Sequence, residues 1–194
     1  MAELRLIKYY TTLNQSNTLV KYIPSLDAID AGPHTAAGGD GNPSVVGLSG
    51  FIMDVRNCND PLFAQAQLYE LDQFYWNPAV SMWNTIGAKN ALTLAFIYDM
   101  SVRHGANGAQ NIINQASSAL GGTPKTGIDE NTFLSRMFTI RDDVLKSENL
   151  SDVDRDAGYK ALLASGNVDL NTPFTFTAYG TPFITTGYLG MVKK

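Results

Sequence analysis

The feature that most constrains this chain is a charged residue within an apolar helical stripe. Residues 90–105, NALTLAFIYDMSVRHG, place apolar side chains at the i, i+3, i+4 and i+7 spacing of one helix face. The members of this face are Leu92, Ala95, Phe96 and Val102. Asp99 falls among them, so the pattern predicts a carboxylate on the buried side of the helix.

A second predicted helix also has a charged residue on its apolar face. Residues 133–145 carry apolar side chains at helical spacing, and Arg141 is in line with Leu134 and Phe138. Removing one member of a buried ion pair costs about 3–5 kcal/mol, so we predict that Asp99 and Arg141 face each other. Two interpretations follow: the pair only fixes the register of the helices, or it orients an active-site carboxylate, because perturbed charges concentrate at such sites.

Composition narrows the class of protein. The chain has 194 residues, enough for one domain with a sizeable core, and its 44% hydrophobic and 16% charged residues are typical of a globular protein. The formal net charge of −4 argues against nucleic acid as a partner and is compatible with a cationic ligand. No apolar run approaches the ~18 residues of a membrane span, so no membrane association is predicted.

The chain also offers few residues for metal or redox chemistry. Cys58 is the one cysteine, which excludes an intramolecular disulfide, and His34 and His104 lie far apart in the sequence. We therefore predict no cofactor and no metal site. The start, MAELRLIKYY, reads as an amphipathic helix and not as a signal peptide, so a chain complete as given would remain cytoplasmic.

Periodicity and caps predict a mainly α chain. The expected helices cover about residues 2–12, 18–29, 48–55, 61–76, 79–86, 90–105, 107–120 and 130–145, with one more from Ser151. Asp60 and Asp129 are expected N-caps, and Gly105 is expected to end its helix. Glu70 is expected on a solvated face. Residues 172–188 are expected to wrap around the helices chiefly as extended coil, with at most a short strand.

Six blocks of the sequence resemble, in order and spacing, the glycoside hydrolase family 46 chitosanases. They are NTLVKYIPSLDAID, GLSGFIMDV, DPLFAQAQLYELDQFYWNPAVS, ALTLAFIYDMSVRHG, GGTPKTGIDENTFLSRMFTIRDDVL and SGNVDLNTPFTFTAYGTPF. The resemblance implies a lysozyme-like α+β fold, of which this chain is chiefly the larger helical lobe and the cleft wall. It also implies hydrolysis of β-1,4-linked glucosamine polymers with inversion, chitosan or glucosamine oligomers as partners, and an extracellular location.

The chain departs from the family pattern at its start. The catalytic glutamate and the second catalytic aspartate of the family precede the helix to which Met1 to Tyr10 aligns, so the resemblance assigns no catalytic residue here. An inverting glycosidase needs two carboxylates about 6.5–9.5 Å apart. The expectation is one domain over residues 1–194 that lacks the N-terminal catalytic segment and is inactive in isolation. The alternatives are a non-catalytic protein that binds amino-sugar polymers, or a segment supplied by another chain.

The missing segment also bears on the surface of the chain. In the family fold the N-terminal helices cover part of this lobe, so an exposed apolar patch is expected near Leu4, Ile7 and the helix of Asp99.

The resemblance does assign supporting residues. Asp99 and Arg141 match a buried charge network that reaches toward the catalytic glutamate of the family, where it would orient the acid and help to set its pKa. Asp129 and Glu130 match an acidic pair that attracts the amines of glucosamine. Their alternative role is structural, as a helix cap and a partner of the helix dipole.

Aromatic residues give a second group of candidates for substrate binding. Tyr75 and Trp76, together with Trp83, are candidates for stacking on sugar rings. Aromatic residues at helical spacing more often belong to the core, so this alternative stays open.

Overall fold

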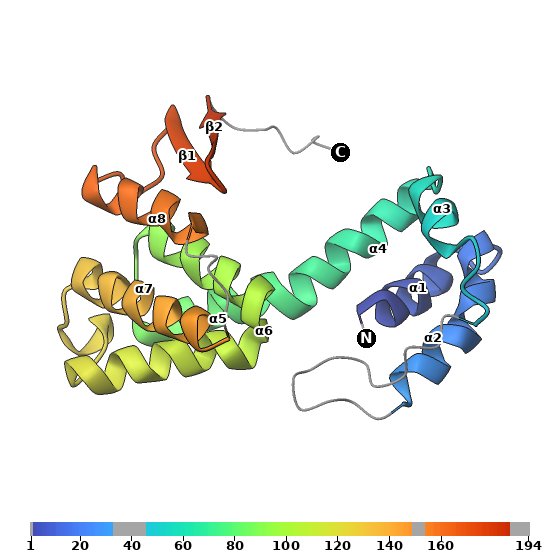
Figure 1. Cartoon of the computed structure of the whole chain (residues 1–194), viewed down its shortest axis with the longest axis horizontal. Coiled ribbons are helices and arrows are strands. Elements are labelled where there is room, and N and C mark those ends of the chain that lie inside the picture. Colours follow the sequence, from blue (N-terminus) through green and yellow to red (C-terminus); the bar gives the residue numbers. More distant parts are fainter. Residues whose placement is uncertain (1, 33–45, 149–153, 187–194) are drawn as a thin grey trace. The chain divides into compact units, whose positions relative to one another are not determined.

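The computed structural model describes residues 2–32, 46–148 and 154–186. The chain divides into two compact units, Met1–Gln73 and Phe74–Lys194. Figure 1 labels their helices and strands in chain order.

The described part of the first unit is helical. Its elements are α1 (Ala2–Leu13), the 3-10 turn η1 (Thr18–Tyr22), α2 (Ile23–Asp30), α3 (Phe51–Arg56) and α4 (Pro61–Leu71). Their apolar faces meet in one core of Leu4, Ile7, Tyr10, Leu19, Tyr22, Leu26, Phe63 and Ala66. The expected exposed patch at Leu4 and Ile7 is therefore wrong, because both side chains are buried against their own unit.

Local signals account for the helix boundaries of this unit. Asp60 caps α4 by accepting the backbone N–H of Leu62 at 2.9 Å, and Pro61 follows at the first helical position, as predicted. Pro24 lies in the first turn of α2, where its missing N–H breaks no helical hydrogen bond. The helix expected over residues 18–29 is therefore divided near this proline into the 3-10 turn and α2.

One acidic residue of the first unit is buried, contrary to expectation. Glu70 was predicted on a solvated face of α4, but its side chain is buried and accepts a hydrogen bond from Arg5 Nε at 2.8 Å. The neighbouring aromatic rings of Tyr9 and Tyr69 stack with centroids 3.8 Å apart. Together these contacts attach α1 to α4, so Glu70 contributes to packing between helices.

The second unit contains the longest helix. Its elements are the π-helical turn η2 (Asp72–Trp76), which begins in the first unit, then α5 (Asn77–Ile86), α6 (Ala91–Leu120), η3 (Pro124–Thr126), α7 (Glu130–Ser147), α8 (Asp154–Ala164), β1 (Phe174–Ala178) and β2 (Thr181–Thr185). The helix end expected at Gly105 is confirmed, because the backbone of this residue is non-helical and α6 consists of two helical segments that meet there. Gly105 has a φ of 70° and a ψ of 166°, which glycine adopts without a Cβ penalty, so this residue kinks α6.

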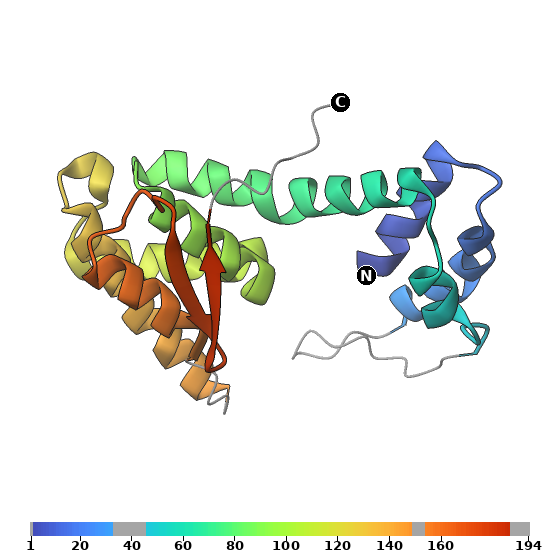
Figure 2. The same cartoon turned by 90° about the horizontal axis from the view of Figure 1, so that it is seen from above.

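The C-terminal part of the described chain is a β-hairpin and not the expected extended coil. β1 and β2 pair antiparallel, with Phe174 opposite Thr185 and Phe176 opposite Phe183. Figure 2 shows the two strands as red arrows. The alternation Phe-Thr-Phe-Thr places Phe174 and Phe176 on one face, where they pack against the core of the unit. The two turn residues, Tyr179 and Gly180, have positive φ values of 52° and 70°, as a tight hairpin turn requires.

A small residue lets α8 approach the hairpin closely. A Cβ at Gly158 would lie 2.6 Å from the carbonyl oxygen of Thr177 and 2.7 Å from the ring of Phe176. Tyr159, the next residue along α8, contacts the same Phe176 ring edge-on with centroids 4.9 Å apart. The hairpin is therefore attached to α8 through these contacts.

Candidate functional site

The two charges singled out in the sequence form an ion pair inside the second unit. Arg141 Nη2 lies 2.8 Å from Asp99 Oδ2, and the two residues are 2% and 3% exposed. The predicted contact between α6 and α7 is thus present in the structure. Whether the pair also serves an active site stays a prediction.

Arg141 has a second carboxylate partner, which the sequence interpretation missed. Its Nη1 donates a hydrogen bond to Asp156 Oδ1 of α8, and the Asp156 side chain is fully buried. One guanidinium therefore joins three helices. A signal was available in the sequence, since Asp156, Tyr159 and Leu163 have the i, i+3, i+7 spacing of a buried helix face.

Aromatic rings surround this charge cluster. The Arg141 Cζ atom lies 5.3 Å from the ring centroid of Phe96, and Phe96 packs edge-on against Phe138 and Tyr159. Apolar surroundings raise the cost of leaving any of these charges unpaired, because a buried charge cannot recover its hydration. The cluster is therefore a rigid and highly constrained part of the fold.

Two basic residues of α6 lie near the cluster. Burial lowers the pKa of His104, and the positive charge of Arg141 lowers it further, so His104 is neutral at pH 7. Arg103, which could have competed for Asp99, instead lies 3.5 Å from Glu148. Asp99 pairs with Arg141 and not with Arg103.

The acidic pair at the start of α7 makes well-defined structural contacts. Asp129 Oδ1 accepts hydrogen bonds from the backbone N–H and the hydroxyl of Thr132, both at 2.8 Å, and these bonds hold the Asp129 pKa below its usual range. Glu130 accepts the backbone N–H groups of Lys89 and Asn90 at 2.8 and 2.9 Å. Asp129 is exposed at the N-terminal end of α7, whereas Glu130 is partly buried. A role of either carboxylate in binding amines stays a prediction.

The three candidate aromatic residues differ in their exposure. Trp76 is 41% exposed and contacts Tyr98 edge-on with centroids 5.6 Å apart. Trp83 packs on the core, and its Nε1 donates to the carbonyl oxygen of Asn90 at 3.2 Å. Tyr75 is half-buried. Trp76 therefore presents the most ring surface for stacking on a sugar, while Trp83 has a core role.

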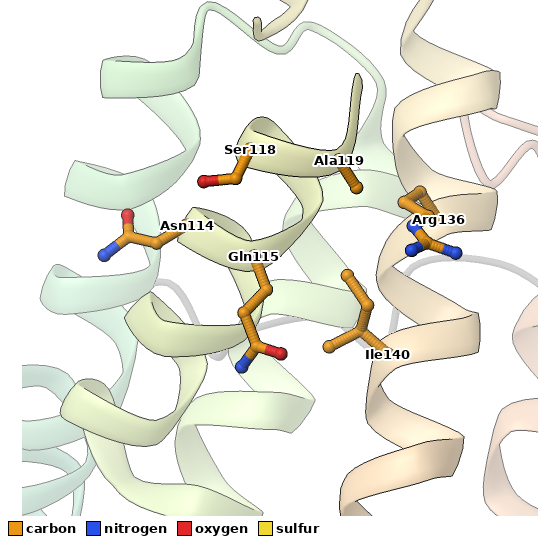
Figure 3. Close-up of a pocket in the computed structure, with 6 residues that line it drawn as sticks. All are labelled: Asn114, Gln115, Ser118, Ala119, Arg136 and Ile140. Atoms are coloured by element: carbon orange, nitrogen blue, oxygen red, sulfur yellow. The ribbon is translucent and has the colours of Figure 1, made fainter. Parts of the chain in front are cut away.

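A hollow of about 490 Å³ lies between α6 and α7 (Figure 3). Its lining residues are Asn114, Gln115, Ser118, Ala119, Arg136 and Ile140. The one ionised group in this lining is the guanidinium of Arg136, which would repel a protonated amine. The hollow is therefore a poorer site for a cationic sugar than the acidic start of α7.

Neither a metal-binding cluster nor a membrane-spanning helix is found in the described ranges. No three or more histidine, cysteine, aspartate or glutamate residues in these ranges are grouped to hold a metal ion. In the same ranges, no helix combines the length and the apolar character needed to cross a bilayer.

Comparison with known sequences places these features in a family. Residues 2–174 match the sequence model of Glycosyl hydrolase family 46. A chitosanase from a Streptomyces species is 31% identical over 187 residues, which cover 93% of this chain and 64% of that protein. A chitosanase from a Nocardioides species is 34% identical over 187 residues, covering 93% of this chain and 63% of that protein. The chain thus spans less than two thirds of the length of these relatives.

Solved structures agree with this assignment. A chitosanase from Gynuella sunshinyii in complex with chitotetraose superposes with a TM-score of 0.83 at 29% identity, over 96% of this chain and 79% of that one. A variant of a Bacillus subtilis chitosanase in complex with 6 GlcN gives a TM-score of 0.81 at 26% identity, over 94% and 78%. The mainly α, lysozyme-like fold expected from the sequence is confirmed. The chain belongs to glycosyl hydrolase family 46.

Proposed function

We propose that this chain provides the substrate-binding part of a chitosanase, an enzyme that hydrolyses β-1,4 linkages between glucosamine residues with inversion. The observation that supports this most is the match to a chitosanase with chitotetraose bound, which extends over 96% of the chain. In this proposal the two catalytic carboxylates lie outside these 194 residues. The residues that are present bind the polymer and support the acid.

The charges of the chain suit such a substrate. Glucosamine polymers carry protonated amines, and the chain has a formal net charge of −4. Asp129 is exposed at the start of α7, and its lowered pKa keeps it ionised into the acid range. Attraction between exposed charges is screened by salt, so binding that depends on Asp129 weakens as ionic strength rises. Trp76 adds an exposed ring for stacking on a sugar.

The buried cluster has a separate task in this proposal. Asp99 and Arg141 match the family network that reaches the catalytic glutamate, and a positioning group must itself be held by packing and hydrogen bonds. The contacts of Arg141 with Asp99 and Asp156 meet that requirement. They would support the acid without touching the substrate.

The direct test is a reducing-end assay on chitosan. We expect no turnover by the 194-residue chain alone and turnover by the same chain carrying a family-like N-terminal extension with both carboxylates. A matched control carries the extension with both carboxylates replaced by amides, and it should be inactive. Turnover by the chain alone would contradict the assignment of the catalytic groups, and a folded but inactive extended chain would contradict the proposed activity.

A second candidate function is binding of amino-sugar polymers without hydrolysis. It is favoured by one specific observation, that the resemblance assigns neither catalytic carboxylate to a residue of this sequence. Salt-sensitive affinity for glucosamine oligomers together with an inactive extended chain would support this function. Turnover by the extended chain would exclude it.

A further inference from the structure

Asp142 on α7 and Asp156 on α8 each have one buried carboxyl oxygen without a hydrogen-bond partner among the described residues. Asp156 Oδ1 accepts from Arg141 Nη1, and Asp142 Oδ2 accepts from Lys160 Nζ at 2.7 Å. The other oxygens, Asp156 Oδ2 and Asp142 Oδ1, are buried and have no hydrogen-bond partner among the described residues. Buried polar atoms without a partner are rare in proteins. Two acceptors on interacting carboxyl groups therefore lack a donor among the residues that the structure describes.

The charges of the cluster do not balance. Arg141 and Lys160 carry two positive charges, whereas Asp99, Asp142 and Asp156 carry three negative charges when all are ionised. Asp156 is fully buried, so water cannot screen the surplus negative charge. Two carboxylates that share such a site do not both ionise readily. A proton bound to one of the two carboxyl groups would remove the surplus negative charge, and its O–H group would be the missing hydrogen-bond donor.

We propose that Asp156 and Asp142 share one proton, with the Asp156 Oδ2–H group donating to Asp142 Oδ1, and that loss of this proton weakens the attachment of α8 to α7. The pair is a pH-sensitive contact within the fold, and it does not depend on the proposed function. Protonated Asp156 keeps its Oδ1 atom for Arg141, and Asp142 keeps its Oδ2 atom for Lys160. The hydrogen bonds of the two residues with Arg141 and Lys160 are therefore both retained.

The electrostatic environment agrees with this arrangement. The pKa of Asp156 is raised to about 6, chiefly by burial; the charge and hydrogen bond of Asp142 also raise it, while the positive charges of Arg141 and Lys160 lower it. On α6, Asp99 and His104 lie near Arg141. The strand β1, which packs on α8, has the sequence FTFTA and contributes no titratable side chain.

The sign of the pH effect follows from proton linkage. The pKa of Asp156 is higher in the folded chain than its ordinary value of 3.8, so the folded state binds this proton more tightly than the unfolded state. The resulting stability is fully present below that ordinary value and is lost as the pH rises through about 6. Each pH unit within this window changes the folding equilibrium constant by about tenfold.

The variant Asp156→Asn imitates the protonated acid at every pH. Its amide oxygen can accept from Arg141, and its N–H can donate to Asp142 Oδ1. The folding constant of D156N, relative to that of the unaltered chain, should rise about a hundredfold between about pH 4 and about pH 7. Urea unfolding followed by tryptophan fluorescence measures this ratio for the second unit, since Trp76 and Trp83 both lie in it.

A control and an independent measurement keep the test decisive. Asp143→Asn, at an exposed position of α7 next to Asp142, should leave the pH profile unchanged. A ratio that is constant with pH, or one that falls as the pH rises, would show that Asp156 is ionised throughout and would overturn the proposal. If D156N fails to fold, the carboxyl ¹³C NMR titration of Asp156 in the unaltered chain decides. A midpoint near 6 supports the shared proton, and a midpoint below 3.8 overturns it.

Discussion

Replacing Arg141 with methionine is expected to destabilise the second unit by about 3–5 kcal/mol, the typical cost of removing one member of a buried ion pair. Methionine fills much of the same space, but it leaves the carboxyl groups of Asp99 and Asp156 without their guanidinium. Both carboxyl groups are buried, so water cannot replace the lost partner. Urea unfolding at neutral pH, followed by the fluorescence of Trp76 and Trp83, measures the loss.

A control on the same helix separates this effect from a general effect of losing an arginine. Arg136 is exposed on α7, and Arg136→Met is expected to change stability by no more than about 0.5 kcal/mol. Adding Asp99→Asn to R141M should recover part of the loss, because a neutral amide is cheaper to bury than an unpaired carboxylate. Equal stability of R141M and R136M would contradict the central role of Arg141 in the cluster.

Replacing Phe96 with alanine is expected to cost about 3–5 kcal/mol, the usual range for removing a fully buried aromatic ring. The Phe96 ring is 0% exposed, and it contacts Phe138 at 4.6 Å and Tyr159 at 5.3 Å between centroids. It also covers the guanidinium of Arg141. Removing it leaves a cavity and loosens α6, α7 and α8 where they meet. The same unfolding experiment measures the loss.

The matched control for Phe96 is a phenylalanine of the hairpin. Phe183 is 55% exposed on β2, and Phe183→Ala is expected to cost no more than about 1 kcal/mol, since little of its surface leaves water on folding. A similar loss for the two alanine variants would show that Phe96 does not contribute to the core as its burial indicates.

Local sequence patterns predicted the helices and the first charged pair for a clear physical reason. A helix face repeats every three to four residues, so a charge out of place, such as Asp99 or Arg141, is visible within one segment. Asp156 lies on a similar buried face of α8, but from the sequence this segment is predicted only as a helix that starts at Ser151, without a buried charge. The capping segment from Ser151 lies outside the described residues, so that expectation stays a prediction.

Features that depend on distant contacts could not be predicted in this way. The hairpin is stabilised by the packing of Phe174 and Phe176 on the core of the second unit. Strands of five residues give only a weak pattern in the sequence itself. The structural alternative for Glu130 was a partner of its own helix dipole, yet Glu130 accepts hydrogen bonds from Lys89 and Asn90, about 40 residues earlier in the sequence. Glu70 is buried because Arg5, from another helix, reaches it.

The most direct test of the account is a calorimetric titration of the chain with the glucosamine hexamer, at low and high salt. We expect binding that weakens as salt increases, and an affinity lowered by up to about fivefold in Asp129→Asn at low salt, as for an exposed ion pair. Asparagine still caps α7, so this variant changes the charge and keeps the helix. Asp143→Asn is the matched control. A flat titration, or binding that depends on neither salt nor Asp129, would contradict the account.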